Sequence, residues 1–163
     1  MADQRILIAG IGNIFLGDDA FGVEVAQRLA RRPLPAGVRV ADFGIRSFDL
    51  AYAILDEPDV TIMVDATPRG GTPGTLYVIE PELGDMAEIG GADVEAHTMN
   101  PVKVLQLVKA YGGQPKRLLV VGCEPARLES DDGALELSAP VHAAVDEAVA
   151  LVESLIQKIL VER

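Results

Sequence analysis

The sequence is poor in the residues that form disulfides and aromatic cores. Cys123 is the single cysteine, so no internal disulfide and no cysteine-based metal cluster can form, and a reducing compartment is expected. Trp is absent, and aromatic residues make up only 4% of the 163 residues. We therefore expect a core of Val, Leu, Ile and Ala, the mixture typical of a sheet that is covered by helices.

Positive charge and long apolar runs are also scarce. The chain has 14 Lys and Arg against 25 Asp and Glu, a formal net charge of −11, which argues against nucleic acid and against an anionic membrane surface. No apolar segment approaches the ~20 residues of a membrane-spanning helix, and the first residues lack a signal-peptide pattern. We expect a cytoplasmic protein with neither nucleic acid nor membrane as its partner.

What the sequence does have is an alternation of apolar strands and helices, which predicts one three-layer α/β/α domain over residues 1–163 with a mostly parallel sheet. The strands are predicted over residues 5–9, 38–43, 60–64, 75–79 and 118–121. The loop ATPRGGTPG is too short to hold a crossover helix, so the strand over 75–79 is predicted to run antiparallel. Helices are predicted between the other strands and at the end of the chain, with Ser47, Asn100 and Ser138 as N-caps.

The stretch ILIAGIGNIFLGDDAFG, residues 6–22, combines a glycine turn with two acids. Gly10-x-Gly12 after a strand is typical of nucleotide-binding turns, but Phe15 stands where the third glycine would be, so close helix–strand packing is not expected. Asp18 and Asp19 would repel a pyrophosphate at the start of the first helix. We expect no nucleotide cofactor, and nucleotide binding is the most distant alternative.

Two further polar residues are predicted to lie near these acids. Asp65 directly follows TIMV, where a carboxylate is costly unless it is solvated, paired or metal-bound. If the first and third strands are neighbours, Asp65 shares a crevice with Asp18 and Asp19, and His97, just before the third helix, lies at the same edge of the sheet. Helix capping for the pair and a turn for Asp65 are the structural alternatives.

Two carboxylates and an imidazole suit Zn, Ni, Mn or Fe, or they can activate water without a resident metal. The sequence has no H-E-x-x-H helix, no G-x-S-x-G elbow and no P-loop to separate these options. Cys123 is interpreted as a buried filler and His142 as a structural or surface residue.

Four segments together resemble the hydrogenase maturation endopeptidases: GIGNIFLGDDAFG, VDATPRGGTPGTLYVIEPE, AHTMNPVKVL and LLVVGCEPARLE. The resemblance is collinear over about residues 5–160 and implies a five-stranded sheet in the order 2-1-3-5-4 with strand 4 antiparallel. It also implies a cytoplasmic endopeptidase that removes the C-terminal extension of a nickel–iron hydrogenase large-subunit precursor after nickel insertion, by an aspartic-type or substrate-metal-dependent mechanism.

By position, the resemblance assigns the metal-contacting and catalytic roles to Asp19, Asp65 and His97, and Asp18 matches an accompanying acid. The glycines of the turn, with Asn13, are expected to shape the loop so that Asp19 projects into the crevice. Nickel is expected to be carried by the precursor and not to be permanently bound. The loop-shaping residues are Gly10, Gly12, Asn13 and Asp18.

Two alternatives are retained beside this interpretation. One is a metallo-amidohydrolase or peptidase with its own bound metal, and the other is a non-catalytic chaperone that checks the precursor for nickel. The segment DFGIRSFDL, which lies near the crevice, departs from the glycine- and threonine-containing segment of many members of the family.

Overall fold

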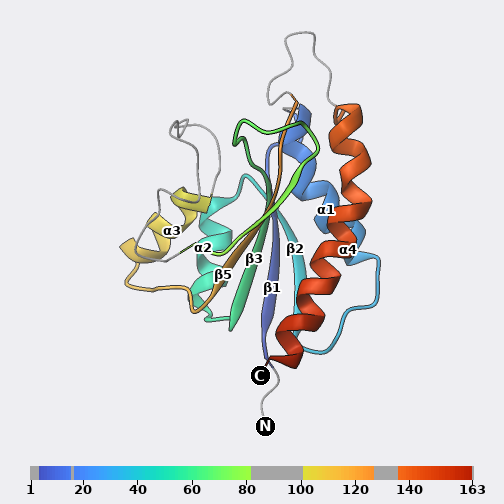
Figure 1. Cartoon of the computed structure of the whole chain (residues 1–163). Helices are drawn as coiled ribbons and strands as arrows, with labels where there is room; N and C mark the ends of the chain where they lie inside the picture. The colour runs from blue at the N-terminus through green and yellow to red at the C-terminus, as the bar shows by residue number, and fades with distance from the viewer. Residues whose placement is uncertain (1–3, 16, 82–100, 127–135, 163) are drawn as a thin grey trace.

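The computed structural model describes residues 4–15, 17–81, 101–126 and 136–162, and its centre is a five-stranded sheet (Figure 1). The strand order is β2-β1-β3-β5-β4, and β4 runs antiparallel to β5 whereas the other neighbours are parallel. The predicted fold class, strand order and antiparallel strand are therefore confirmed. The strands are β1 (Ile6–Ile11), β2 (Val38–Gly44), β3 (Val60–Ala66), β4 (Leu76–Ile79) and β5 (Leu118–Cys123).

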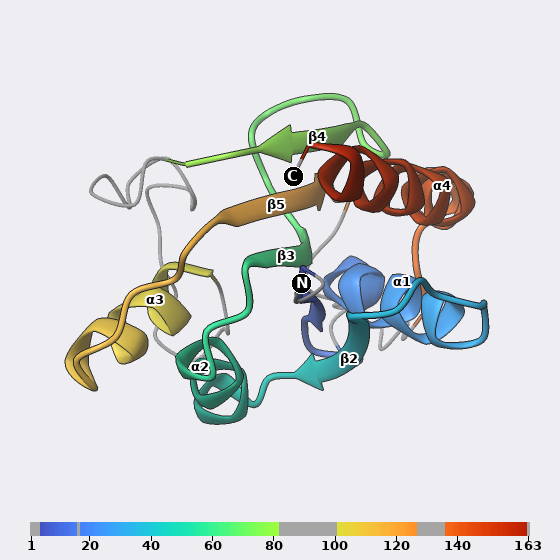
Figure 2. The ribbon, with the colours of Figure 1, turned by 90° about the horizontal axis from the view of Figure 1, so that it is seen from below.

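Helices cover both faces of the sheet (Figure 2). α1 (Phe21–Ala30) and α4 (Ala139–Val161) pack on one face, and α2 (Ser47–Leu55) and α3 (Pro101–Ala110) pack on the other. The two buried clusters are almost entirely aliphatic, as predicted, with Phe21 in one and Phe43 in the other. Among the described residues, no helix has both the length and the apolar character needed to cross a bilayer.

The first helix packs closely on the sheet, contrary to the expectation drawn from Phe15. A Cβ on Gly22 would overlap the carbonyl oxygens of Ile11 and Val64, and one on Gly10 would overlap the carbonyl oxygen of Gly22. The close approach is therefore provided by Gly22, inside α1, together with Gly10, because only glycine leaves room for the two backbones. The prediction was wrong because it looked for the third glycine at one fixed spacing.

Two of the three predicted N-caps can be compared with the structure. Ser47 is the first residue of α2 and Arg46 is its N-cap, with no side-chain capping bond, so that prediction was wrong. Ser138 is the N-cap residue of α4, as predicted, but its side chain makes no capping bond and donates to Asp18 instead. The predicted cap Asn100 lies outside the described residues.

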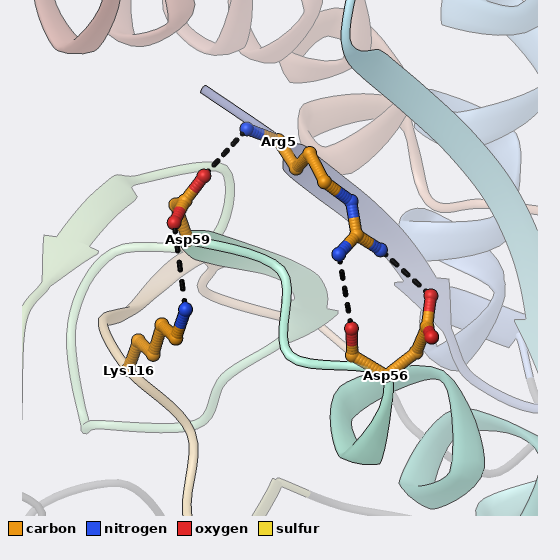
Figure 3. Close-up of polar contacts among 4 residues, drawn as sticks. All are labelled: Arg5, Asp56, Asp59 and Lys116. Atoms are coloured by element: carbon orange, nitrogen blue, oxygen red, sulfur yellow. Dashed lines mark hydrogen bonds and ion pairs between the residues drawn. The ribbon is translucent and has the colours of Figure 1, made fainter. Parts of the chain in front are cut away.

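The amino-terminal edge of the sheet is tied together by ion pairs (Figure 3). The backbone N–H of Arg5 donates to Asp59 over 2.8 Å, and its guanidinium donates to the Asp56 carboxylate over 2.7 Å. Lys116 lies 3.7 Å from the other carboxylate oxygen of Asp59. Each acid of this edge that the close-up shows therefore has a cationic partner.

Candidate functional site

The loop after β1 is folded around the carboxylate of Asp19. Gly12 has a φ of 141°, and a Cβ there would overlap the carbonyl oxygen of Asp19, so a glycine is needed where the loop turns back. The N–H of Asn13 donates to Oδ2 of Asp19 over 2.8 Å, while Oδ1 of Asn13 accepts the N–H of Phe15 over 2.9 Å. The turn thereby holds the half-buried Asp19 side chain by one oxygen.

Asp65 lies one residue before the end of β3, beside Asp19. Asp65 is only 5% exposed, and its Oδ1 has no hydrogen-bond partner among the described residues. Burial raises the pKa of Asp65 well above its usual value, and the charge of Asp19 raises it further, against a smaller lowering by the N–H of Ala66. The structure thus brings Asp19 and Asp65 together at the carboxyl edge of neighbouring strands.

Burial also raises the pKa of Asp19, although the hydrogen bond from the N–H of Asn13 works in the opposite direction. Neither Asp19 nor Asp65 forms an ion pair with any residue that the structure describes. A buried and a half-buried carboxylate side by side favour either a shared proton or a cation between them. Carboxylate oxygens are donors that suit a divalent metal, and Oδ1 of Asp65 has no competing hydrogen-bond partner among the described residues. The same pair can orient a water molecule and accept its proton.

Asp18 differs from its neighbour, because it ties distant segments together. It lies in the 3₁₀ turn η1 (Gly17–Ala20) and is fully buried. Its carboxylate accepts the N–H of Ala126 over 2.8 Å, the N–H of Ser138 over 2.7 Å and the hydroxyl of Ser138 over 2.8 Å. Asp18 therefore fixes the first loop to the chain after β5 and to the start of α4.

His97 lies outside the described residues, so the structure does not test the predicted triad. In residues 4–15, 17–81, 101–126 and 136–162, no group of three or more His, Cys, Asp and Glu side chains could hold a metal ion. Cys123 is buried in β5, and burial raises the pKa of its thiol to about 12, so the thiol stays protonated. His142 is exposed on α4.

Glu124 is a buried carboxylate that the sequence analysis did not single out. It follows β5 directly, and its Oε1 accepts the N–H of Arg69 and of Gly71 over 2.9 Å each and the hydroxyl of Tyr77 over 2.6 Å. Burial raises the pKa of Glu124, but these hydrogen bonds outweigh burial and the net pKa is lowered. Glu124 therefore holds the loop that follows Asp65. An acid directly after an apolar strand, the signal that pointed to Asp65, was present here too.

Several solved structures with this fold are endopeptidases that mature hydrogenases. The *Escherichia coli* hydrogenase maturating endopeptidase HybD aligns with a TM-score of 0.80 and 29% identity, covering 95% of this chain and 93% of that one. A hydrogenase 2 maturation peptidase from a Thaumarchaeota archaeon aligns with a TM-score of 0.70 and 31% identity, over 94% of this chain and 99% of that one.

Sequence comparison gives the same class. The sequence model described as hydrogenase maturation protease matches residues 23–155. The hydrogenase expression/formation protein HupD of *Rhodobacter capsulatus* is 33% identical over 150 residues, which are 90% of this chain and 70% of that protein. The chain belongs to the hydrogenase maturation protease family.

Proposed function

We propose that this protein is the endopeptidase that removes the C-terminal extension of a nickel–iron hydrogenase large-subunit precursor once nickel has been inserted. Family membership supports a peptidase that processes hydrogenase. The observation that carries the finer proposal is the buried oxygen of Asp65 beside Asp19, which has no hydrogen-bond partner among the residues that the structure describes. A carboxylate pair held at this energetic cost is suited to a cation that arrives with the substrate.

In this proposal, Asp19 and Asp65 contact the nickel of the precursor and orient the attacking water. Burial makes the carboxylate of Asp65 more basic, so in its deprotonated form Asp65 accepts a proton from the water that adds to the scissile carbonyl. His97 acts as a third contact to the metal or as the proton donor to the leaving amine. Recognition of nickel by the pair would make cleavage depend on the loaded state of the precursor, with no nucleotide involved.

The proposal is tested by mass spectrometry of nickel-loaded and nickel-free precursor after incubation with the protein. The wild type is expected to trim only the loaded precursor. Asp19→Asn, Asp65→Asn and His97→Ala are each expected to slow trimming by about a hundredfold or more, since each removes a group that handles the metal or a proton. Asp59→Asn, at the opposite edge of the sheet, is the matched control and is expected to trim normally.

Three outcomes would contradict the proposal. Equal trimming of nickel-free precursor would remove the role of nickel in recognition. A stoichiometric metal that copurifies with the protein would favour an amidohydrolase or peptidase with its own metal. Binding of loaded precursor without any change in its mass would indicate a chaperone that checks for nickel.

A further inference from the structure

A line of exposed apolar side chains starts beside the two carboxylates. Eight large apolar side chains are exposed among the described residues, and six of them lie on the loops after β1 and β2, on α2 and just after α3. We call these six the apolar stripe: Ile14, Phe15, Ile45, Phe48, Tyr52 and Tyr111. The sequence has four Phe and three Tyr, seven in all, and the stripe holds four of these seven. Most of the few aromatic residues of this chain therefore lie on this surface and not in the core.

The stripe is continuous because specific contacts join its parts. The N–H of Gly12 donates to the carbonyl of Gly44 over 2.9 Å, which holds the loop bearing Ile14 and Phe15 against the loop bearing Ile45. Phe48 and Tyr52 are four residues apart on α2 and so share one face of the helix.

At its far end, the stripe crosses from α2 to the end of α3. The rings of Tyr52 and Tyr111 are stacked, with their centroids 5.7 Å apart. α2 and α3 lie next to each other on the same face of the sheet (Figure 2). The exposed fractions stay high along this line, with Phe15 at 66%, Phe48 at 55% and Tyr52 at 59%.

Arg46, which lies between Ile45 and Phe48 of the stripe, is bonded to its own chain. The guanidinium of Arg46 donates to the carbonyls of Asp42 and Phe43 and to the Asp49 carboxylate, the last over 3.3 Å. The guanidinium of Arg46 is therefore held beside the apolar side chains by its own chain. Exposed apolar side chains that gather on one surface are typical of an interaction site.

We infer that the apolar stripe binds an apolar segment of the large-subunit precursor next to its scissile bond. This inference rests on the proposed function. A polypeptide that is cut at Asp19 and Asp65 must pass the loop of Asn13, whose N–H is bonded to Asp19, and Phe15 follows two residues later. α2 has nine residues and is about 14 Å long, which about four residues of an extended chain would span. The occupant is thus a short apolar stretch within a few residues of the cut.

The test is a titration of nickel-loaded precursor against the catalytically impaired Asp65→Asn protein, carrying in addition Phe48→Ser and Tyr52→Ser. These side chains are more than half exposed, so their replacement is expected to leave folding intact. The affinity for the precursor is expected to fall about tenfold or more. In the otherwise wild-type enzyme, the same two changes are expected to raise KM by a similar factor with kcat nearly unchanged. Val78→Ser and Val161→Ser, two exposed apolar positions away from the stripe, are the matched controls and are expected to change neither quantity.

The outcomes separate this inference from the proposed function. Unchanged affinity in the stripe variant would overturn the inference while leaving cleavage by Asp19 and Asp65 intact. Weaker binding of the stripe variant in a protein that never cleaves would support the stripe and refute the protease. Sedimentation of the protein alone decides the remaining case, because a loss of self-association with unchanged precursor affinity would assign the stripe to a second copy of this chain.

Discussion

Carboxylates at the amino-terminal ends of the strands of the central sheet have different partners from those at the carboxyl ends. At the amino-terminal edge, Asp56 and Asp59 lie beside Arg5 and Lys116 (Figure 3), and these are ordinary, partly exposed ion pairs. At the carboxyl edge, Asp65 is buried, has an oxygen with no partner among the described residues, and faces another acid. The same residue type is thus neutralised at one edge and left uncompensated at the other. Burial of a carboxylate without a partner lowers stability, and sites of this kind are typical of functional positions.

Location alone does not explain the contrast, because Glu124 also lies at the carboxyl edge. Its carboxylate is as buried as that of Asp65, yet it accepts three hydrogen bonds from the loop of residues 69–71 and from Tyr77. The difference between the two acids is therefore one of partners. Glu124 stabilises the fold, whereas Oδ1 of Asp65 has no hydrogen-bond partner among the residues that the structure describes.

The largest effect on stability is expected for Glu124→Ala. The change leaves two backbone N–H groups and the Tyr77 hydroxyl without their acceptor, and it should lower the free energy of unfolding by about 2–4 kcal/mol. Glu124→Gln keeps an acceptor oxygen and is expected to cost less. Urea denaturation gives both values. Equal stability of the alanine variant and the wild type would show that the hydrogen bonds of Glu124 do not hold the loop.

The pH dependence of the Glu124 contribution follows from its lowered pKa. The stabilisation is present above the pKa of this group in the unfolded chain and is lost as the pH falls through the folded-state value. The difference in the free energy of unfolding between the wild type and Glu124→Gln should therefore become smaller as the pH is lowered.

An opposite change is expected for Asp65→Asn, which should raise the free energy of unfolding by about 1–2 kcal/mol at neutral pH while abolishing cleavage. Below the unfolded-state pKa, the carboxyl is neutral in both states and burial carries no charge penalty. As the pH rises toward the raised folded-state pKa, the folded protein binds more protons than the unfolded chain, so wild-type stability falls. Denaturation of the wild type and of Asp65→Asn at about pH 4 and about pH 7 measures the effect. The extra stability of Asp65→Asn over the wild type should be smaller at the lower pH. A destabilised variant at neutral pH would mean that Asp65 is compensated after all.

The smallest effect is expected for Asp59→Asn at the amino-terminal edge. The ion pair with Lys116 is partly exposed, and an amide oxygen can still accept the N–H of Arg5, so the loss should stay below about 1 kcal/mol. Raising the salt concentration should reduce the difference further, because exposed charges are screened. A loss as large as that of Glu124→Ala would erase the contrast between the two edges.

Local pattern was enough to predict the sheet, because apolar runs, turn residues and one short loop determine strand position and direction. The strand order came from the family resemblance. Pattern also pointed to Asp65, since an acid at the end of a buried strand is costly, and to the pair of acids on the glycine loop. The choice of Asp19 over Asp18 came from the family resemblance.

The local sequence pattern did not predict the contacts between segments that are far apart in the sequence. Asp18 is separated by 108 and 120 residues from the partners it holds, Ala126 and Ser138, and nothing in the local sequence names them. The Ser138 hydroxyl, expected to cap α4, donates to Asp18 instead. The close packing of α1 was also missed, because it uses Gly22 within the helix and not a glycine at the usual spacing.

Gly22 also sets the gap between the two acids. Asp19 precedes Gly22 by three residues, and Asp65 directly follows Val64, against whose carbonyl Gly22 packs. The contact that separates the segments bearing the two acids is thus made by main-chain atoms of Gly22 and Val64. It does not depend on which aliphatic side chains fill the two cores.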